Sequence, residues 1–207
     1  MNTAFAAPFA VQVGEARIAL DAPPGFSDTQ FTGSPRLIDI AESLTPATNR
    51  VLLFALEDAD LRRFMVGDPI ERRRFVLVAT SRAMQQESLS LASFRAFVAG
   101  SLGTQGTTPP QGDLIAYLDA RPEGQASPIG EVRAQPEVAS LLLGTRLPPA
   151  REDAPRRYLV SSRTLLLLRG KALELSVFSR YESGADLEWV RGATERWVEE
   201  LRRLNLR

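Results

Sequence analysis

The 207-residue sequence contains no histidine and no cysteine. Histidine is the side chain that titrates nearest neutral pH, so its absence excludes Ser-His-Asp and Cys-His catalytic groups. The absence of cysteine excludes thiolate nucleophiles, disulfides and thiolate zinc sites. Catalysis would therefore depend on carboxylates, hydroxyls or Lys171, the single lysine. A bound metal would be a hard cation held by oxygen ligands, such as Mg²⁺ or Ca²⁺.

Long apolar runs and an excess of one charge are also missing. No apolar stretch approaches the roughly 20 residues that a membrane-spanning helix needs. Basic and acidic residues number 25 each, with a formal net charge of zero, which argues against a nucleic-acid partner. Arg72-Arg73-Arg74 is the densest basic run, but the apolar run 75–79 follows it, so it indicates the start of a strand. We expect no cofactor.

The N-terminus resembles the end of a secretory leader. Residues 1–10 lack the basic segment and apolar core of an intact signal peptide. However, Ala4-Phe5-Ala6 is followed by Ala7-Pro8, with small residues on both sides of a cleavage point. We therefore expect residues 1–8 to be a leader remnant of a periplasmic or exported protein. The length predicts one domain over residues 1–207.

Periodic patterns predict both strands and helices. Unbroken apolar runs at 51–56, 75–79 and 165–168 indicate strands covered on both faces. Two hairpins are predicted, 9–13 with 16–21 about Gly14-Glu15, and 157–168 with 172–181 about Arg169-Gly170-Lys171. Helices are predicted after Ser34-Pro35, over 58–65, from Ser90 to Leu102, over 113–120 and over 186–204. Residues 121–135 are expected to be irregular, and 138–143 to form a strand.

The last helix has the clearest apolar face. Seven residues share that face at 100° per residue, namely Leu187, Val190, Thr194, Trp197, Val198, Leu201 and Leu204. Glu199 is expected to pair with Arg203 on the outside. Amphipathic helices and strands covered on both faces together predict an α+β fold, in which a mainly antiparallel sheet lies between helices as a three-layer α/β/α sandwich.

Three short features resemble the Mog1/PsbP-like α/β/α sandwich family. They are an N-terminal strand pair ending in Pro24-Gly25-Phe26, the late hairpin with Arg169-Gly170-Lys171, and a terminal helix that carries Trp189 and Trp197. The resemblance is weak and concerns topology only, and residues 103–155 do not share in it. It implies a non-catalytic interaction or assembly scaffold, and it carries no catalytic motif to this chain.

An acidic cluster is the candidate metal site. Glu57, Asp58 and Asp60 follow an apolar strand, and the end of a strand is a suitable place for oxygen ligands. Their spacing differs from that of an EF-hand loop. The alternative, which we favour, is that they start a helix and complement its dipole.

Two further motifs favour structural interpretations. Residues 100–112 are rich in glycine but lack the lysine of a phosphate-binding loop, so they indicate a flexible connection. Lys171 together with Ser161 or Ser162 supplies the residue types of a catalytic Ser-Lys dyad. Such a dyad needs a buried lysine beside its serine. We reject the dyad because Lys171 is expected in a solvated turn and the serines at the far end of the strand.

Trp189 is the candidate partner-binding residue. It lies about 120° from the centre of the apolar face of the last helix, whereas Trp197 lies within that face. Tryptophan is enriched at interface hot spots, so an off-face tryptophan predicts a partner anchor. The favoured alternative is that it packs at the edge of the sheet.

Three functional hypotheses follow. The first is a non-enzymatic protein-interaction or assembly module of the bacterial envelope or periplasm, with an unidentified protein partner. The second is a small-ligand or hard-metal binding protein, or a carboxylate-based enzyme, that uses the 103–112 loop and Glu57–Asp60. The third is a cytosolic accessory protein of a secretion system. The sequence does not predict the oligomeric state.

Overall fold

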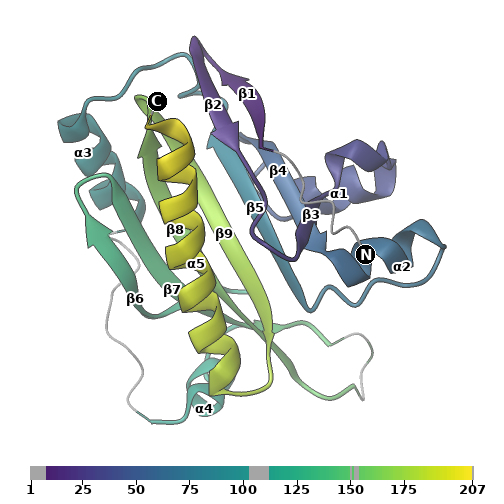
Figure 1. Cartoon of the computed structure of the whole chain (residues 1–207). Helices are drawn as coiled ribbons and strands as arrows, with labels where there is room; N and C mark the ends of the chain where they lie inside the picture. Colours follow the sequence, from purple (N-terminus) through teal and green to yellow (C-terminus); the bar gives the residue numbers. More distant parts are fainter. Residues whose placement is uncertain (1–7, 103–111, 150, 152–153, 207) are drawn as a thin grey trace.

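A computed structural model describes residues 8–102, 112–149, 151 and 154–206 (Figure 1). Its strands are β1 (Phe9–Val13), β2 (Ala16–Leu20), β3 (Phe26–Asp28), β4 (Asn49–Glu57), β5 (Arg74–Ser81), β6 (Ser127–Gln135), β7 (Val138–Leu147), β8 (Arg157–Leu168) and β9 (Lys171–Tyr181). Its helices are α1 (Pro35–Ser43), α2 (Asp58–Met65), α3 (Leu91–Leu102), α4 (Leu114–Asp119) and α5 (Gly184–Asn205), with a 3-10 turn η1 (Gln30–Thr32).

Seven strands form one sheet in the order β3-β4-β5-β9-β8-β7-β6, and β1 and β2 form a separate hairpin. Every neighbouring pair in the large sheet is antiparallel. The expected α+β fold with a mainly antiparallel sheet is therefore confirmed. The centre of the sheet joins β5 to β9, which are far apart in the sequence, so α3, α4 and three strands are inserted between them.

The β8–β9 turn is one residue shorter than expected. Arg169 and Gly170 both have positive φ, 50° and 77°, which is the conformation of a two-residue hairpin turn that matches the strand twist. Lys171 is therefore not in the turn. It is the first residue of β9 and pairs with Leu168, and its side chain is buried. The prediction that Lys171 is solvated was wrong.

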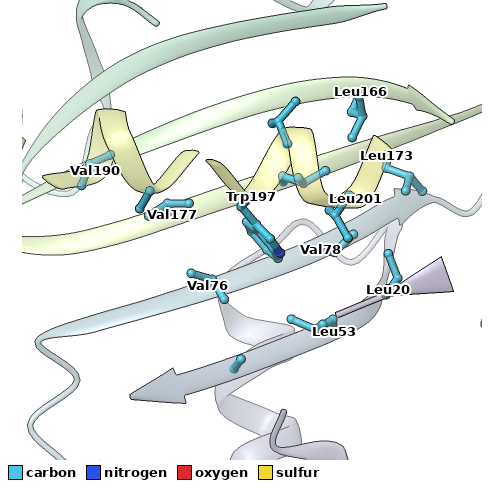
Figure 2. Close-up of a cluster of buried hydrophobic side chains, with 14 of the residues drawn as sticks. Leu20, Leu53, Val76, Val78, Leu166, Leu173, Val177, Val190, Trp197 and Leu201 are labelled. Atoms are coloured by element: carbon cyan, nitrogen blue, oxygen red, sulfur yellow. The ribbon is translucent and has the colours of Figure 1, made fainter. Parts of the chain in front are cut away.

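One face of the sheet is covered by α5 and the β1–β2 hairpin, and we call it the α5 face. Figure 1 shows α5 lying along β8 and β9, which it contacts extensively. Figure 2 shows Trp197 pointing from α5 towards Val76 and Val78 of β5. The Nε1 of Trp197 donates to the Asp21 carbonyl oxygen at 2.8 Å, so the same side chain ties the hairpin to the core. The predicted apolar face of this helix is confirmed, with Val190, Thr194, Trp197, Val198 and Leu201 all buried.

The opposite face carries two separate sets of helices. α1 and α2 pack over β4 and β5, where Leu37 meets Phe54 and Phe75 in one buried cluster. α3 packs over β7 and β8, where Phe94 meets Leu141. Helices therefore lie on both faces of the sheet, as the predicted three-layer arrangement requires.

Two local predictions were wrong. Residues 127–135 form the edge strand β6, although 121–135 was expected to be irregular; Pro128 and Gly130 interrupt the alternation, and the pairing with β7 has two irregularities. An edge strand tolerates both residue types because one side of it needs no ladder partner. Glu199 pairs with Arg133 and Arg202, not with Arg203, which pairs with Glu200.

Other predictions agree with the structure. α2 spans residues 58–65 as expected, Ser34 and Pro35 start α1, and Arg74 begins β5. No helix in the part of the chain that the structure describes is both long and apolar enough to cross a membrane.

Candidate functional site

Trp189, the predicted partner anchor, is half-buried in the first half of α5. Its ring centroid lies 6.1 Å from that of Phe26, at the start of the edge strand β3. The Arg74 guanidinium lies 4.2 Å from the centroid of the Trp189 ring, at a distance suited to a cation–π interaction. These contacts support the edge-packing alternative. A role of Trp189 as a partner anchor stays a prediction.

The acidic cluster lies at the N-terminus of α2. Asp58 and Asp60 are in the first turn and Glu57 precedes it, which is the position that the helix-start interpretation predicts. Ser27 donates its hydroxyl hydrogen to Asp58 Oδ1 at 2.7 Å. Asp60 is buried and accepts two backbone N–H groups of the turn before β5, from Glu71 at 3.3 Å and from Arg72 at 2.9 Å.

These carboxylates therefore already have protein partners. Burial is the main cause that raises the pKa of Glu57 above its ordinary value. Within residues 8–102, 112–149, 151 and 154–206, no group of three or more acidic side chains converges as metal ligands. A metal site at Glu57, Asp58 and Asp60 stays a prediction.

The glycine-rich segment and the Ser-Lys pair are the other two motifs that the sequence offered. Residues 103–111 of the glycine-rich segment lie outside the described residues. Ser161 and Ser162 pair with Phe178 and Val177, six to seven positions along the hairpin from Lys171, or about 20 Å at the rise of a strand. The rejection of a Ser-Lys dyad is therefore correct, although only because of distance, since Lys171 is buried.

A cavity of about 230 Å³ lies on the face opposite α5, where the two sets of helices leave the sheet partly open. We call it the α3 groove. Phe97 of α3 forms one wall, and Met84 with Asn49 lies on the other side. Arg163 and Leu165 of β8 and Glu174 of β9 form the floor. In the described part of the chain, no helix on this face makes more than marginal contact with β9.

The floor of the α3 groove holds an ion pair. Arg163 Nη2 donates to Glu174 Oε2 at 3.0 Å, and the two side chains are 30% and 21% exposed. Both groups are thus partly desolvated but reachable from the groove. Arg163 Nε is buried and has no hydrogen-bond acceptor among the described residues. A buried donor without an acceptor is unfavourable, so the pairing of this guanidinium is incomplete.

The chemistry of the groove favours binding over catalysis. Its described lining includes the hydroxyls of Ser81 and Ser101, but a nucleophilic hydroxyl needs an adjacent base. Glu174 is the one carboxylate in that lining, and it already pairs with Arg163. The arrangement offers one charged donor and one charged acceptor side by side, framed by apolar side chains and by the polar groups of Thr48, Asn49, Ser81 and Ser101.

Sequence reasoning missed this site, although a signal was present. Glu174 and Ser176 are the polar members of the alternating pattern in β9, and they mark a face that is not fully covered. Arg163 lies between Leu159 and Ser161 on one side and Leu165 and Leu167 on the other, on the same face of β8. Neither signal shows that the two charges meet. That depends on the pairing of β8 with β9, which places Arg163 opposite Ser176 and therefore next to Glu174.

No protein-family profile and no curated protein matches this chain. Two solved structures are similar to it. The Ran-binding protein Mog1p of Saccharomyces cerevisiae is 15% identical, with a TM-score of 0.41, over 95% of this chain and 93% of that one. A point mutant of Mog1 is 14% identical, with a TM-score of 0.41, over 96% and 94%. The likeness is weak, lies in the fold alone, and agrees with the topology-level resemblance noted in the sequence.

Proposed function

We propose that the chain is a non-enzymatic protein-interaction module of the bacterial envelope or periplasm, and that its α3 groove holds a segment of a partner protein. One observation carries the proposal, namely that the groove combines partly apolar walls with a partly desolvated ion pair on a sheet face that the helices leave open. Such a surface offers burial to an apolar side chain and orientation to a polar one.

The size of the groove favours a protein segment over a free ligand. Its volume of about 230 Å³ is below the roughly 300–1,000 Å³ that is usual for drug-sized ligands. A single side chain fits a cavity of this size, and the rest of the segment then lies across its rim. The second hypothesis, a small-ligand protein, is therefore less well supported by the geometry.

The envelope setting has a separate basis. It depends on the leader-like residues before Pro8, which lie outside the described residues. Fractionation of cells that express the gene from its natural upstream region tests it. Recovery of the protein from the periplasm is expected, and recovery from the cytosol alone would remove this part of the proposal.

Capture with a blocked groove tests the interaction. Ser101 lines the groove from α3, so Ser101→Trp fills it. Ala99 is exposed on the same helix and is absent from the described lining, so Ala99→Trp is a matched control. Tagged wild-type and variant proteins are incubated with bacterial extract, and the captured proteins are quantified by mass spectrometry. A photo-crosslinking residue at position 97 then shows whether a captured protein touches the groove.

We expect a partner that wild-type protein and Ala99→Trp capture equally and that Ser101→Trp loses. That partner should also crosslink from position 97. Equal capture by all three proteins would refute the groove as the binding site. Turnover of a substrate by the purified protein, lost in a carboxylate variant, would refute a non-enzymatic role.

A further inference from the structure

The α3 groove has a defined polar chemistry that narrows the kind of partner. Arg163 presents N–H donors and Glu174 presents acceptor oxygens, with Nη2 and Oε2 3.0 Å apart. The two side chains come from neighbouring strands, so the sheet fixes their separation. The site is neutral in sum, but it has one donor and one acceptor side by side.

This pair discriminates among the polar groups of a protein partner. A carboxylate would accept from Arg163 but would be repelled by Glu174, and an ammonium or guanidinium would meet the reverse problem. A hydroxyl can also accept from Arg163 and donate to Glu174, but both bonds then converge on one oxygen atom and are not parallel. A primary carboxamide carries a carbonyl acceptor and an N–H donor on the same side, so it can accept from Arg163 and donate to Glu174 at once.

We propose, building on the function proposed above, that the α3 groove recognises the carboxamide of a glutamine or asparagine side chain in an extended segment of the partner protein. The apolar stem of that side chain packs between Phe97 and Leu165, and the amide lies against the Arg163–Glu174 pair. A guanidinium carries five N–H donors, and one from Arg163 bonds to Glu174 Oε2, so the exposed part of this side chain leaves donor capacity for the amide oxygen.

Methyl labelling of methionine gives a direct test. The chain has three methionines. Met84 lines the groove, whereas Met65 is 67% exposed at the end of α2 and serves as an internal control. The probes are N-acetyl amino acid N-methylamides of glutamine, glutamate, lysine and methionine, and a seven-residue alanine-based peptide with a central glutamine. Methyl NMR shifts are followed as each probe is added, to a concentration on the order of 10 mM.

The expected result is a saturable shift of Met84, and not of Met65, with the glutamine probe. The glutamate probe keeps only the bond from Arg163 and the lysine probe only the bond to Glu174, and the loss of one bond together with the like-charge repulsion predicts about tenfold weaker binding. The peptide should bind more tightly than the blocked single residue, because it also contacts the rim. Tighter binding of the blocked glutamine than of the peptide would point to a small carboxamide ligand and overturn the assignment to a protein segment.

Variants of the ion pair sharpen the test. Arg163→Met should remove the preference for glutamine. The reversed pair, Arg163→Glu with Glu174→Arg, should keep it, because a carboxamide can turn over and use the same two bonds. Thermal unfolding shows whether each variant is folded. If Arg163→Met is destabilised, Glu174→Gln takes its place, and this variant should also lose the preference for glutamine.

The outcomes separate this inference from the function on which it rests. Equal shifts of Met84 with all four blocked probes would overturn carboxamide recognition and leave the groove as a binding site. No shift with any probe would also overturn it, while capture by wild-type protein but not by Ser101→Trp would still support the interaction module. Self-association that Ser101→Trp abolishes would identify a second copy of this chain as the occupant and refute a separate partner.

Discussion

Replacing Lys171 by methionine tests whether one buried cation ties two distant segments to the sheet. Lys171 is 4% exposed, and its Nζ donates to the carbonyl oxygens of Gln85 at 3.0 Å and Glu87 at 2.6 Å. Both acceptors belong to the connection between β5 and α3. The β1–β2 turn lies against the same place, since a Cβ added to Gly14 would be 3.0 Å from that Nζ.

The expected loss follows from these contacts. A hydrogen bond with a charged donor contributes about 1.5–3 kcal/mol, and Lys171 makes two. Methionine keeps an unbranched apolar stem, and the lost charge recovers part of the desolvation free energy of a buried ammonium. We therefore expect Lys171→Met to lower the free energy of unfolding by about 2–4 kcal/mol. The melting temperature should fall by roughly 5–15 °C for a domain of this size.

Urea titration and thermal unfolding followed by circular dichroism measure the change. The control is Arg169→Met, because Arg169 is exposed in the adjacent turn and should change stability by less than about 0.5 kcal/mol. An equally small effect of both substitutions would refute the reasoning. A second measurement uses the fact that Lys171 is the single lysine, so an acylating reagent should modify it in urea but not in buffer.

Three further predictions concern other parts of the fold. Trp189→Ala should lower the free energy of unfolding by about 2 kcal/mol and leave partner capture unchanged; reduced capture by a protein of normal stability would instead identify Trp189 as an anchor. Gly14→Ala should cost at least about 2 kcal/mol, because φ is 56° and the new Cβ would lie 2.2 Å from a carbonyl oxygen; a normal melting temperature would contradict the geometry. Asp186→Asn should lower stability at neutral pH by about 1–2 kcal/mol. Burial tends to raise the pKa of Asp186, but backbone N–H groups and Arg74 outweigh it, so the pKa lies below its ordinary value of 3.8. The stabilisation is therefore complete above that value and is lost as the pH falls through the folded-state pKa. The difference between the two proteins in urea titrations should begin to shrink at about pH 4 and vanish below the folded-state pKa. A difference that stays constant would refute the assignment.

Local sequence patterns were sufficient to predict a helix or strand where one side of that element is buried and the other is not. The alternation of Leu173, Leu175 and Val177 identified β9, and the 100° repeat identified the buried face of α5. Both patterns are imposed by a single neighbouring layer, so a short stretch of sequence carries the whole signal. β6 lacks such a pattern because it is an edge strand interrupted by Pro128 and Gly130, and its place depends on its partner β7.

A one-residue difference in a turn changed the interpretation of Lys171. The expected three-residue turn exposes its side chain, whereas the observed two-residue turn makes it the first residue of β9, facing the β5–α3 connection. Turn length decides which residue first pairs with the partner strand, here Lys171 with Leu168. The acidic cluster was easier to place, since Asp58 and Asp60 lie in the first turn of their own helix.

The sequence by itself determined the class of the fold, most of its elements and the absence of histidine and thiol chemistry, because these depend on composition and on short-range periodicity. Only the tertiary structure decided that Arg163 and Glu174 meet on the floor of a groove. Their proximity depends on the register of two strands, and their accessibility depends on where α1, α2 and α3 end on the opposite face. Both are set by packing between segments far apart in the chain, which no local pattern encodes.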